Sequence, residues 1–235
     1  MKSREFERDA TRVMHNDFED IPCMKPLICR FLMWSGMLAA VTVIPAFAQT
    51  PAAPPAPIEV SGIKFGAART GSGAWYETEI EVQGRPGVAT DNGNFINRVK
   101  VTLNIGVFSV KSPQASKIPD TYYRASAEAV GVETGGGKTV FRFYLPPEIV
   151  KRDKITGDLK FYLVELFVGG KALPLTKYHY PAATFTKPEI VESFRSKVSS
   201  EAGANDGILL PQYLTPFAFD NSGPIPSFIR VESTH

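Results

Sequence analysis

A period-two alternation of apolar and polar residues dominates the chain from Ile58 onward and constrains its fold more than any other feature. The clearest run is Phe95 to Val110. One face of this run carries Val99, Val101, Leu103, Ile105 and Val107, and the other carries Lys100, Thr102 and Asn104. Because successive side chains of a strand point to opposite faces, the run predicts a long, half-buried strand.

Four more segments predict strands. Apolar residues alternate with glutamates from Ala74 to Gln83, small residues recur from Tyr123 to Ala129, and phenylalanines alternate from Val140 to Leu145. Leu159 to Val168 is apolar on both faces, which predicts a central strand covered on both sides. Glu165 within it needs a partner or a place near an edge, because an unpaired buried charge is costly.

Turn residues separate these strands at Asn92-Gly93, Gly135 to Gly137 and Gly169-Gly170. Strands at this spacing, with glycine turns between them, predict a mainly β protein built as an antiparallel sandwich or barrel.

A helix is predicted near residues 187–202. Thr186 and Glu189 have the spacing of a capping box, and Pro188 falls in the first turn. The apolar stripe consists of Ile190, Val191, Phe194 and Val198. Gly203 is the expected stop.

Two further segments are predicted to lie on the body of the fold. Pro146 to Arg152 suits a second, short helix. The tail from Gly207 to His235 carries four prolines and several large apolar residues. We expect the tail to pack on the sheets without forming a central strand, because proline cannot donate to a ladder.

An export signal precedes this pattern. Lys25 and Arg30 are followed by an uncharged, mostly apolar run from Phe31 to Phe47, and Ala46 to Ala48 is an A-x-A cleavage site. We expect Met24 to be the true start; the alternative is an unusually long n-region. An uncleaved membrane anchor is the alternative reading of the apolar run.

The predicted organisation therefore has three parts: residues 1–48 as the signal region, residues 49–57 as a Pro/Ala-rich linker, and residues 58–235 as a single β-sandwich domain with a packed C-terminal tail. Cleavage after Ala48 removes Cys23 and Cys29, so the mature chain is cysteine-free and forms no disulfide. No pilin-type G-F-x-x-x-E site precedes the apolar run, and no cysteine follows it as in a lipoprotein. We expect an exported protein of the periplasm, outer membrane or cell surface, with no integral membrane span after cleavage.

The charge balance gives no support for a nucleic-acid partner. The chain has 26 Lys+Arg and 24 Asp+Glu residues, and the predicted signal region carries equal numbers of each sign. The mature chain therefore keeps the net charge of +2, which gives no electrostatic argument for binding to nucleic acid or anionic lipid.

Two glycine-rich segments resemble phosphate-binding loops only superficially. Gly131 to Thr139 has the wrong spacing for a P-loop, and its lysine precedes a predicted strand rather than a helix. Ala68 to Gly73 also lacks a following helix. We expect both to be turns, and we expect no cofactor.

Metal chemistry has few candidate ligands. The predicted mature chain contains only His179 and His235 and no cysteine, so a His/Cys cluster cannot form. Asp91 to Asn94 lacks the alternating oxygen ligands of an EF-hand and suits a hairpin turn, although another acidic calcium site stays open. We expect no metal site and a packing role for His179.

Catalytic candidates are equally sparse. No G-x-S-x-G elbow occurs, and without cysteine and with one internal histidine the options for a nucleophile and its base are narrow. Glu77, Glu79 and Glu81 could supply paired carboxylates for glycoside hydrolysis. A row of glutamates on one strand face is more typical of a solvated surface, so we expect a non-enzyme.

Adjacent aromatic residues are the remaining candidate site. Alternation sends Trp75 and Tyr76 to opposite faces, and likewise Tyr122 and Tyr123. We expect one ring of each pair in the core and the other to be a surface contact. Sugar rings stack on exposed aromatic faces, so a glycan platform is conceivable.

The segments IEVSGIKFGAARTGSGAWYETEIEVQGRP and KFYLVELFVGGKALPLTKYHYP carry a family resemblance. The chain resembles the immunoglobulin-like envelope proteins encoded beside type IV pilus genes in Akkermansia, a verrucomicrobial gut genus, over about the whole predicted mature chain. The resemblance implies an Ig-like sandwich, distantly akin to the soluble domains of archaeal type IV pilins. The Cys…Trp…Cys pin of antibody domains is impossible here.

The resemblance also implies a function. We expect a non-enzymatic, type IV pilus-associated envelope protein that acts in pilus assembly or host contact through protein–protein interfaces. Its partners would be pilus or outer-membrane proteins, or the host surface. The alternative is a carbohydrate-binding module for mucin glycans.

Overall fold

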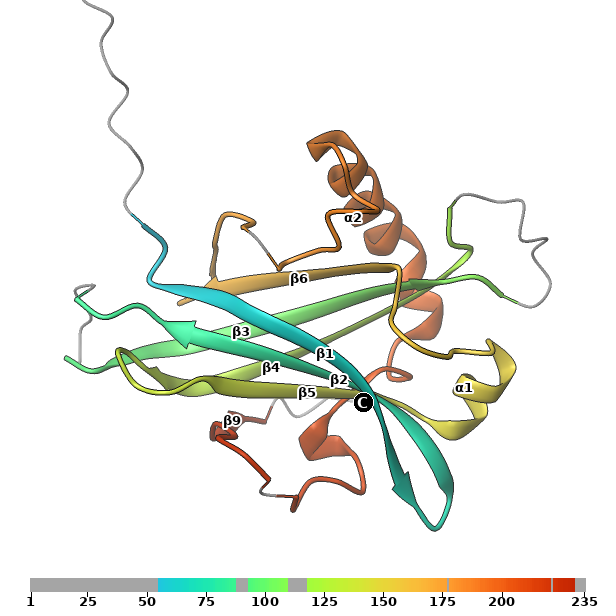
Figure 1. Ribbon diagram of the computed structural model, residues 1–235, viewed down its shortest axis with the longest axis horizontal. Helices are drawn as coiled ribbons and strands as arrows, with labels where there is room; N and C mark the ends of the chain where they lie inside the picture. The colour runs from blue at the N-terminus through green and yellow to red at the C-terminus, as the bar shows by residue number, and fades with distance from the viewer. Residues whose placement is uncertain (1–54, 88–92, 110–117, 177, 221, 231–235) are drawn as a thin grey trace, which may run out of the picture. The chain divides into compact units, whose positions relative to one another are not determined.

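The computed structural model describes residues 55–87, 93–109, 118–176, 178–220 and 222–230. The predicted signal region, its cleavage site and most of the linker lie outside these residues. Within them the protein is mainly β, with two antiparallel sheets and two α-helices (Figure 1). The prediction of an antiparallel sandwich is confirmed.

Sheet A has the strand order β1-β2-β5-β8, and sheet B has the order β7-β6-β3-β4-β9. The strands of sheet A are β1 (Ile58–Thr70), β2 (Gly73–Gly84), β5 (Thr139–Leu145) and β8 (Leu210–Pro211). Those of sheet B are β7 (Lys171–Ala172), β6 (Phe161–Val168), β3 (Phe95–Val107), β4 (Thr121–Glu133) and β9 (Phe228–Ile229). The helices are α1 (Pro147–Arg152) and α2 (Pro188–Glu201), with 3-10 turns η1 (Ala202–Asn205) and η2 (Gln212–Leu214).

The order of strands β1 to β7 matches an immunoglobulin-type Greek key. Strands β1, β2 and β5 take the places of A, B and E, and β7, β6, β3 and β4 take the places of G, F, C and C′. Between β1 and β7 the chain changes sheet after β2, after β4 and after β5. The sandwich is therefore Ig-like in its connections.

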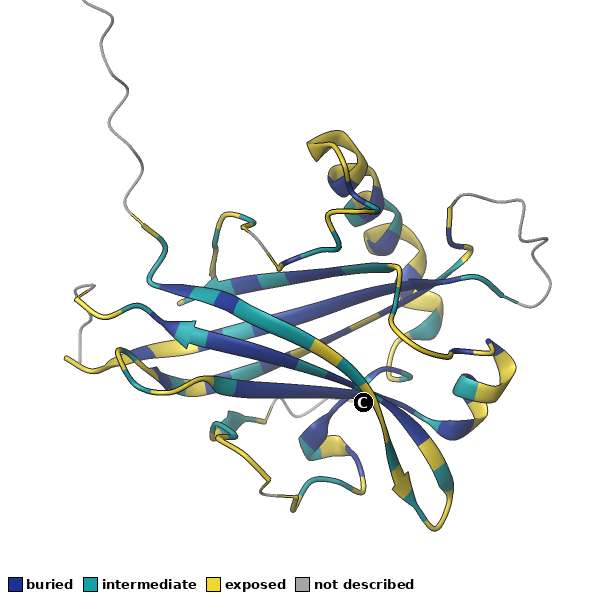
Figure 2. Ribbon diagram, in the orientation of Figure 1, coloured by how far each residue is buried: buried dark blue, intermediate teal, exposed yellow. Residues whose placement is uncertain are grey.

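The core lies between the inward faces of the two sheets. The alternating residues of β3 predicted to face inward are all buried, and they pack in one cluster with Ile80 and Phe141 of sheet A. Figure 2 shows buried positions along the middle of both sheets and exposed positions at the hairpin tips. Burying one such apolar side chain contributes about 1.5–3 kcal/mol, so this two-sided cluster is the main stabilising feature of the fold.

The outer face of sheet B is also covered, which corrects the expectation that β3 is half-buried. Thr102 and Asn104 are buried although they point away from the core. Helix α2 covers this side of the sheet, and the second apolar cluster lies beneath it: Tyr122, Leu163, Phe185, Val191, Phe194, Val198 and Ala202. Close packing requires glycine at position 106, because an added Cβ would lie 2.9 Å from Phe194 and 2.8 Å from Pro119.

Helix α2 forms where it was predicted but begins differently. Its N-cap is Lys187, with no side-chain capping bond, so the capping box predicted from Thr186 does not form. Pro188 occupies the first turn and presets the backbone for the helix. Val191 is buried, whereas Ile190 is 40% exposed because it lies off the stripe that meets the sheet. The helix continues through Gly203 as a 3-10 turn rather than stopping there.

Strand β6 is covered on both faces, as predicted, and Glu165 has the partners it needs. Its carboxylate lies 2.9 Å from Arg195 Nε of α2 and accepts a 2.9 Å hydrogen bond from Asn104 Nδ2 of β3. The ion pair therefore fixes α2 over the sheet as well as neutralising a charge inside a largely apolar strand.

The described part of the C-terminal segment, residues 207–220 and 222–230, packs on the body and supplies only short edge strands, as predicted. Strand β8 pairs with β5 in sheet A, and β9 pairs with β4 in sheet B. Between them, Val140 N donates to Pro224 O (3.0 Å) and Val130 N donates to Ser227 O (2.8 Å). One side of the sandwich is thus closed by a single segment that touches both sheets.

Candidate functional site

Among the residues that the structure describes, strand β1 has an uncovered edge. It spans 13 residues and is the first strand of sheet A, and within the described part of the chain no strand pairs with its second edge. The outermost strands β7, β8 and β9 span two residues each. Long edges present unpaired backbone groups that can accept another strand, so β1 is the main candidate interface of this fold.

The register with β2 determines which β1 amides face outward. Thr70 pairs with Gly73 across a two-residue turn, and pairs continue along the strands to Ile58 and Gly84. Hydrogen-bonded and non-hydrogen-bonded pairs alternate in an antiparallel ladder. Counting from the turn, the amide of Ala68 points to β2 and the amide of Ala67 points to the free edge.

Two features limit indiscriminate pairing at this edge. The register shifts between Val60 and Gly62, so a bulge interrupts the strand near its start. Lys64 is a charged residue, with a side chain 65% exposed, in the middle of the edge. Bulges and lysines are the devices by which natural proteins protect edge strands, and they restrict pairing to a partner that accommodates both.

An apolar seam runs beside the edge. Ile63 and Phe65 of β1 are half-buried and pack against the core cluster. Phe65 meets Tyr162 of β6 edge to face, with ring centroids 5.4 Å apart. Sheet B therefore contributes a ring at the border of sheet A, and a strand added to β1 would place alternate side chains over this seam.

The glutamate row beside β1 is paired rather than freely solvated, which corrects the sequence expectation. Glu81 is 7% exposed and is shared by Lys64 and Lys138, and Arg142 Nε lies 3.2 Å from Glu79. The hydrogen bonds from Lys138, and then from Lys64, hold the pKa of Glu81 below its usual value. The row is therefore a charge-compensated face, with Lys64, Lys138 and Arg142 as its cations.

Trp75 and Tyr76 lie on opposite faces, but neither is an exposed ring. Trp75 is 8% exposed on the outer face of sheet A, where Phe217 of the tail covers it edge to face at 5.9 Å. Tyr76 is 6% exposed in the core, and its hydroxyl donates to Gly157 O at 2.7 Å. Burial raises the pKa of Tyr76 well above its usual range.

Tyr122 and Tyr123 are likewise both buried. Tyr122 packs under α2 beside Phe194, with ring centroids 5.8 Å apart, and burial raises its pKa to about 12. Tyr123 points into the core. The expected exposed ring of each aromatic pair is therefore covered, because α2 and the C-terminal segment lie over the outer faces of the sheets.

A polar cluster that sequence patterns did not indicate lies at the end of the sandwich near α1. Asp153 is buried and accepts hydrogen bonds from Tyr123 and from Arg152 Nε, the latter at 2.7 Å. Tyr123 and Asp153 are 30 residues apart and belong to no motif, so only the fold brings them together. Two hollows of about 530 and 620 Å³ open beside the cluster and share Ser109 and Asp153.

His179 and the glycine-rich segment before β5 both have contacts typical of structural residues. His179 is buried, and its Nδ1 lies 2.7 Å from Val164 O, which holds the segment after β7 against β6. Burial lowers its pKa. Gly131 to Thr139 joins β4 to β5, and its Lys138 contacts Glu81. Asp91 lies outside the described residues, among which no three His, Cys, Asp or Glu side chains gather as metal ligands.

Comparisons with known proteins assign neither a family nor a function to the chain. No protein-family model matches the chain, and no curated protein or solved structure is significantly similar to it. In the described part of the chain, no helix has the length and apolar character needed to cross a membrane.

Proposed function

We propose that this chain is an exported, non-enzymatic envelope protein that works by protein–protein contact in a type IV pilus-associated assembly. The observation that carries the mode of action is the edge of the 13-residue strand β1, which no strand covers within the described residues. The pilus association is supported by the sequence resemblance alone. Strand addition links the open edge of β1 to the proposed assembly, because extended segments of a partner protein bind exposed sheet edges through their backbones.

The neighbourhood of β1 supports a selective contact. Backbone pairing would supply affinity, at about 0.5–1.5 kcal/mol net for each hydrogen bond. Side chains on the partner strand would supply selectivity by packing on Ile63, Phe65 and Tyr162, which form the half-buried seam. The bulge near Gly62 fixes where regular pairing can start.

Glycan binding has less support as the alternative. Its expected surface contacts came from Trp75, Tyr76, Tyr122 and Tyr123, and each of these side chains is at most 8% exposed. Among the described residues, no other aromatic side chains form a flat groove that could replace these contacts.

The test is capture from native envelope with the mature protein as bait, followed by mass spectrometry. Three baits are compared: wild type, Ala67→Pro and Phe219→Ala. The first change removes an amide at the free edge, and the last changes a side chain that is 90% exposed and remote from β1 in sequence. We expect a type IV pilus component with wild type and Phe219→Ala, and its loss with Ala67→Pro.

Two results would overturn the proposal. One is capture of no pilus component by wild type; the other is equal capture by Ala67→Pro. Loss of mucin binding alone on gene deletion would instead favour the glycan-binding alternative.

A further inference from the structure

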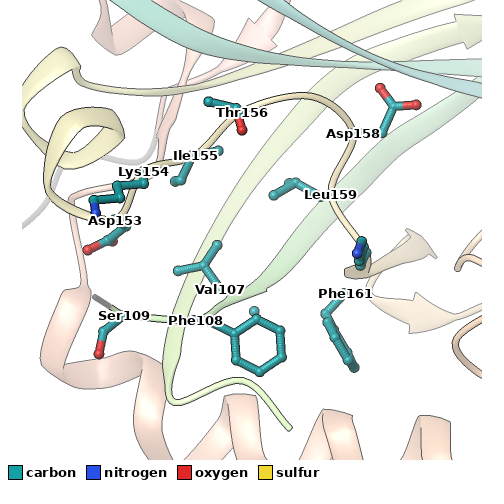
Figure 3. Close-up of a pocket in the computed structure, with 12 residues that line it drawn as sticks. Val107, Phe108, Ser109, Asp153, Lys154, Ile155, Thr156, Asp158, Leu159 and Phe161 are labelled. Carbon is teal, nitrogen blue, oxygen red and sulfur yellow. The ribbon is translucent and has the colours of Figure 1, made fainter. Parts of the chain in front are cut away.

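A hollow of about 530 Å³ lies between the end of β3 and the loop that joins α1 to β6. Its walls come from residues 106–109 and from residues 153–161 (Figure 3). No residue of β1 lines it, so it is independent of the proposed partner edge. Its volume falls within the range of about 300–1,000 Å³ typical of small-ligand sites.

The floor of the hollow is apolar. Figure 3 shows Val107, Ile155 and Leu159 directed toward its middle, with the rings of Phe108 and Phe161 side by side along one border. The two rings meet edge to face at 5.6 Å. Phe108, Leu159 and Phe161 are only half-buried, so their apolar surface is available to a ring-sized body.

The rim carries two unpaired cations. Lys154 and Lys160 are exposed, and within the described residues neither has a carboxylate partner within 4.0 Å. The buried acid of the lining, Asp153, is already occupied by Tyr123 and Arg152. Asp158 is the remaining acid, and Figure 3 shows its carboxylate directed away from the ring pair.

Lys154 stands at a position where a lysine is unfavourable. It directly follows the C-cap of α1 and has a φ of 50°. Glycine is the usual residue in this left-handed position, because any Cβ there introduces strain. Backbone strain of this kind persists where the surrounding structure enforces it, often at ligand sites. The backbone at Lys154 is therefore strained.

We propose that this hollow binds a small amphipathic anion. Its aromatic or apolar body would lie on Phe108, Leu159 and Phe161, and its acidic group would pair with a lysine of the rim, Lys154 or Lys160. The apolar floor provides most of the affinity, and the unpaired lysines select the charge.

The experiment is a fluorescence titration of the mature protein with two probes that share a ring system. One is 8-anilinonaphthalene-1-sulfonate, and the other is the neutral N-phenyl-1-naphthylamine. We expect the anionic probe to bind severalfold more tightly, with the preference shrinking as salt is raised. Amide shifts in NMR spectra should map to residues 106–109 and 153–161.

Variants separate the ligand role from folding. Lys154→Gly should weaken binding of the anionic probe about two- to fivefold, the range for one exposed ion pair, without lowering the free energy of unfolding. Lys160→Ala should act alike, and Asp158→Asn should strengthen binding. Lys171→Ala, an exposed lysine of β7, is the matched control and should change nothing.

The proposal fails if both probes bind equally well to wild type. It also fails if Lys154→Gly and Lys160→Ala leave anion binding unchanged, or if the amide shifts map elsewhere. Phe161→Ala should weaken both probes, and equal retention of both by that variant would exclude the apolar floor as the binding surface.

Discussion

The two long sides of the sandwich end in different ways. On one side, residues 207–230 close the border, pairing with β5 through β8 and with β4 through β9. On the other side, β7 and the segment after it cover β6, whereas β1 keeps its full outer edge unpaired within the described residues. The same chain thus shortens or covers three borders and leaves the longest one open.

The closed side shows what an edge needs in order to be covered. Phe217 stacks on Tyr144, with centroids 4.6 Å apart, and Arg142 donates to Ser222 O at 2.5 Å. Gln212 is buried and donates to the carbonyls of Phe217 and Asp220. The closing segment is therefore held by aromatic stacking and by several hydrogen bonds. No comparable segment lies over β1 among the described residues.

Proline substitutions in β1 should give the largest contrast. Ala68→Pro removes an amide that points to β2 and should lower the free energy of unfolding by about 2–3 kcal/mol. Ala67→Pro removes an amide at the free edge and should cost less than about 1 kcal/mol, because edges tolerate proline. Urea unfolding measures both. Equal losses would show that the edge of β1 is not open.

Loss of the aromatic anchor tests the closed side. Phe217→Ala should lower the free energy of unfolding by about 2 kcal/mol, below the 3–5 kcal/mol of a fully buried phenylalanine because this ring is half-buried. The matched control is Phe219→Ala, which alters a ring that is 90% exposed and should change stability by less than about 0.5 kcal/mol. Similar values for the two variants, measured by thermal and urea unfolding, would contradict this account of the closure.

The polar tie within the closing segment should have a smaller effect. Gln212→Leu keeps the volume but leaves the carbonyls of Phe217 and Asp220 without their donor. We expect a loss of about 1–2 kcal/mol in unfolding free energy. Hydrogen exchange should also speed up at Val130 and Val140, the amides that donate to the segment. Unchanged exchange at both would separate Gln212 from the closure.

The charged face beside β1 should make a pH-dependent contribution. Glu81 has a pKa held below its usual value of 4.5 by Lys138 and Lys64. A carboxyl whose pKa is lowered by folding stabilises the folded state above its unfolded pKa, and this stabilisation is lost as pH falls through the folded pKa. Between pH 6 and pH 3 the free energy of unfolding should therefore fall less in Glu81→Gln than in wild type. The difference between the two falls is the contribution of one carboxyl group to the pH dependence of stability. Parallel curves for the two proteins in urea titrations would contradict the shift.

Local alternation predicted the core-facing side of the strands well, because the side chains that face the core recur at every second residue. Val99 to Val107 and Phe141 to Leu145 lie as their periodicity indicated. The sequence pattern could not show which side chains are buried by residues far away along the chain. The burial of Trp75 depends on Phe217, and the burial of Tyr122 depends on Phe194, each more than 70 residues away along the chain.

The candidate site illustrates the same limit. Exposed edges were expected in general, but that β1 is the open one follows from strand order, which no single segment encodes. The contact between Tyr123 and Asp153 and the hollow beside it likewise arise where β4, α1 and the end of β3 converge. The capping box predicted from Thr186 was wrong. The spacing of Thr186 and Glu189 suited a cap, but the N-cap of the helix is Lys187, one residue later.

Residue-resolved hydrogen exchange in β1 tests the central claim most directly. The amides of Ile63, Phe65 and Ala67 should exchange fast in the free protein, and those of Lys64, Gly66 and Ala68 should be protected by β2. Adding the purified pilus component recovered by capture should protect the first set and leave the second unchanged. Protection of the first set already in the free protein, or its continued fast exchange in the complex, would contradict the assignment of β1 as the partner edge.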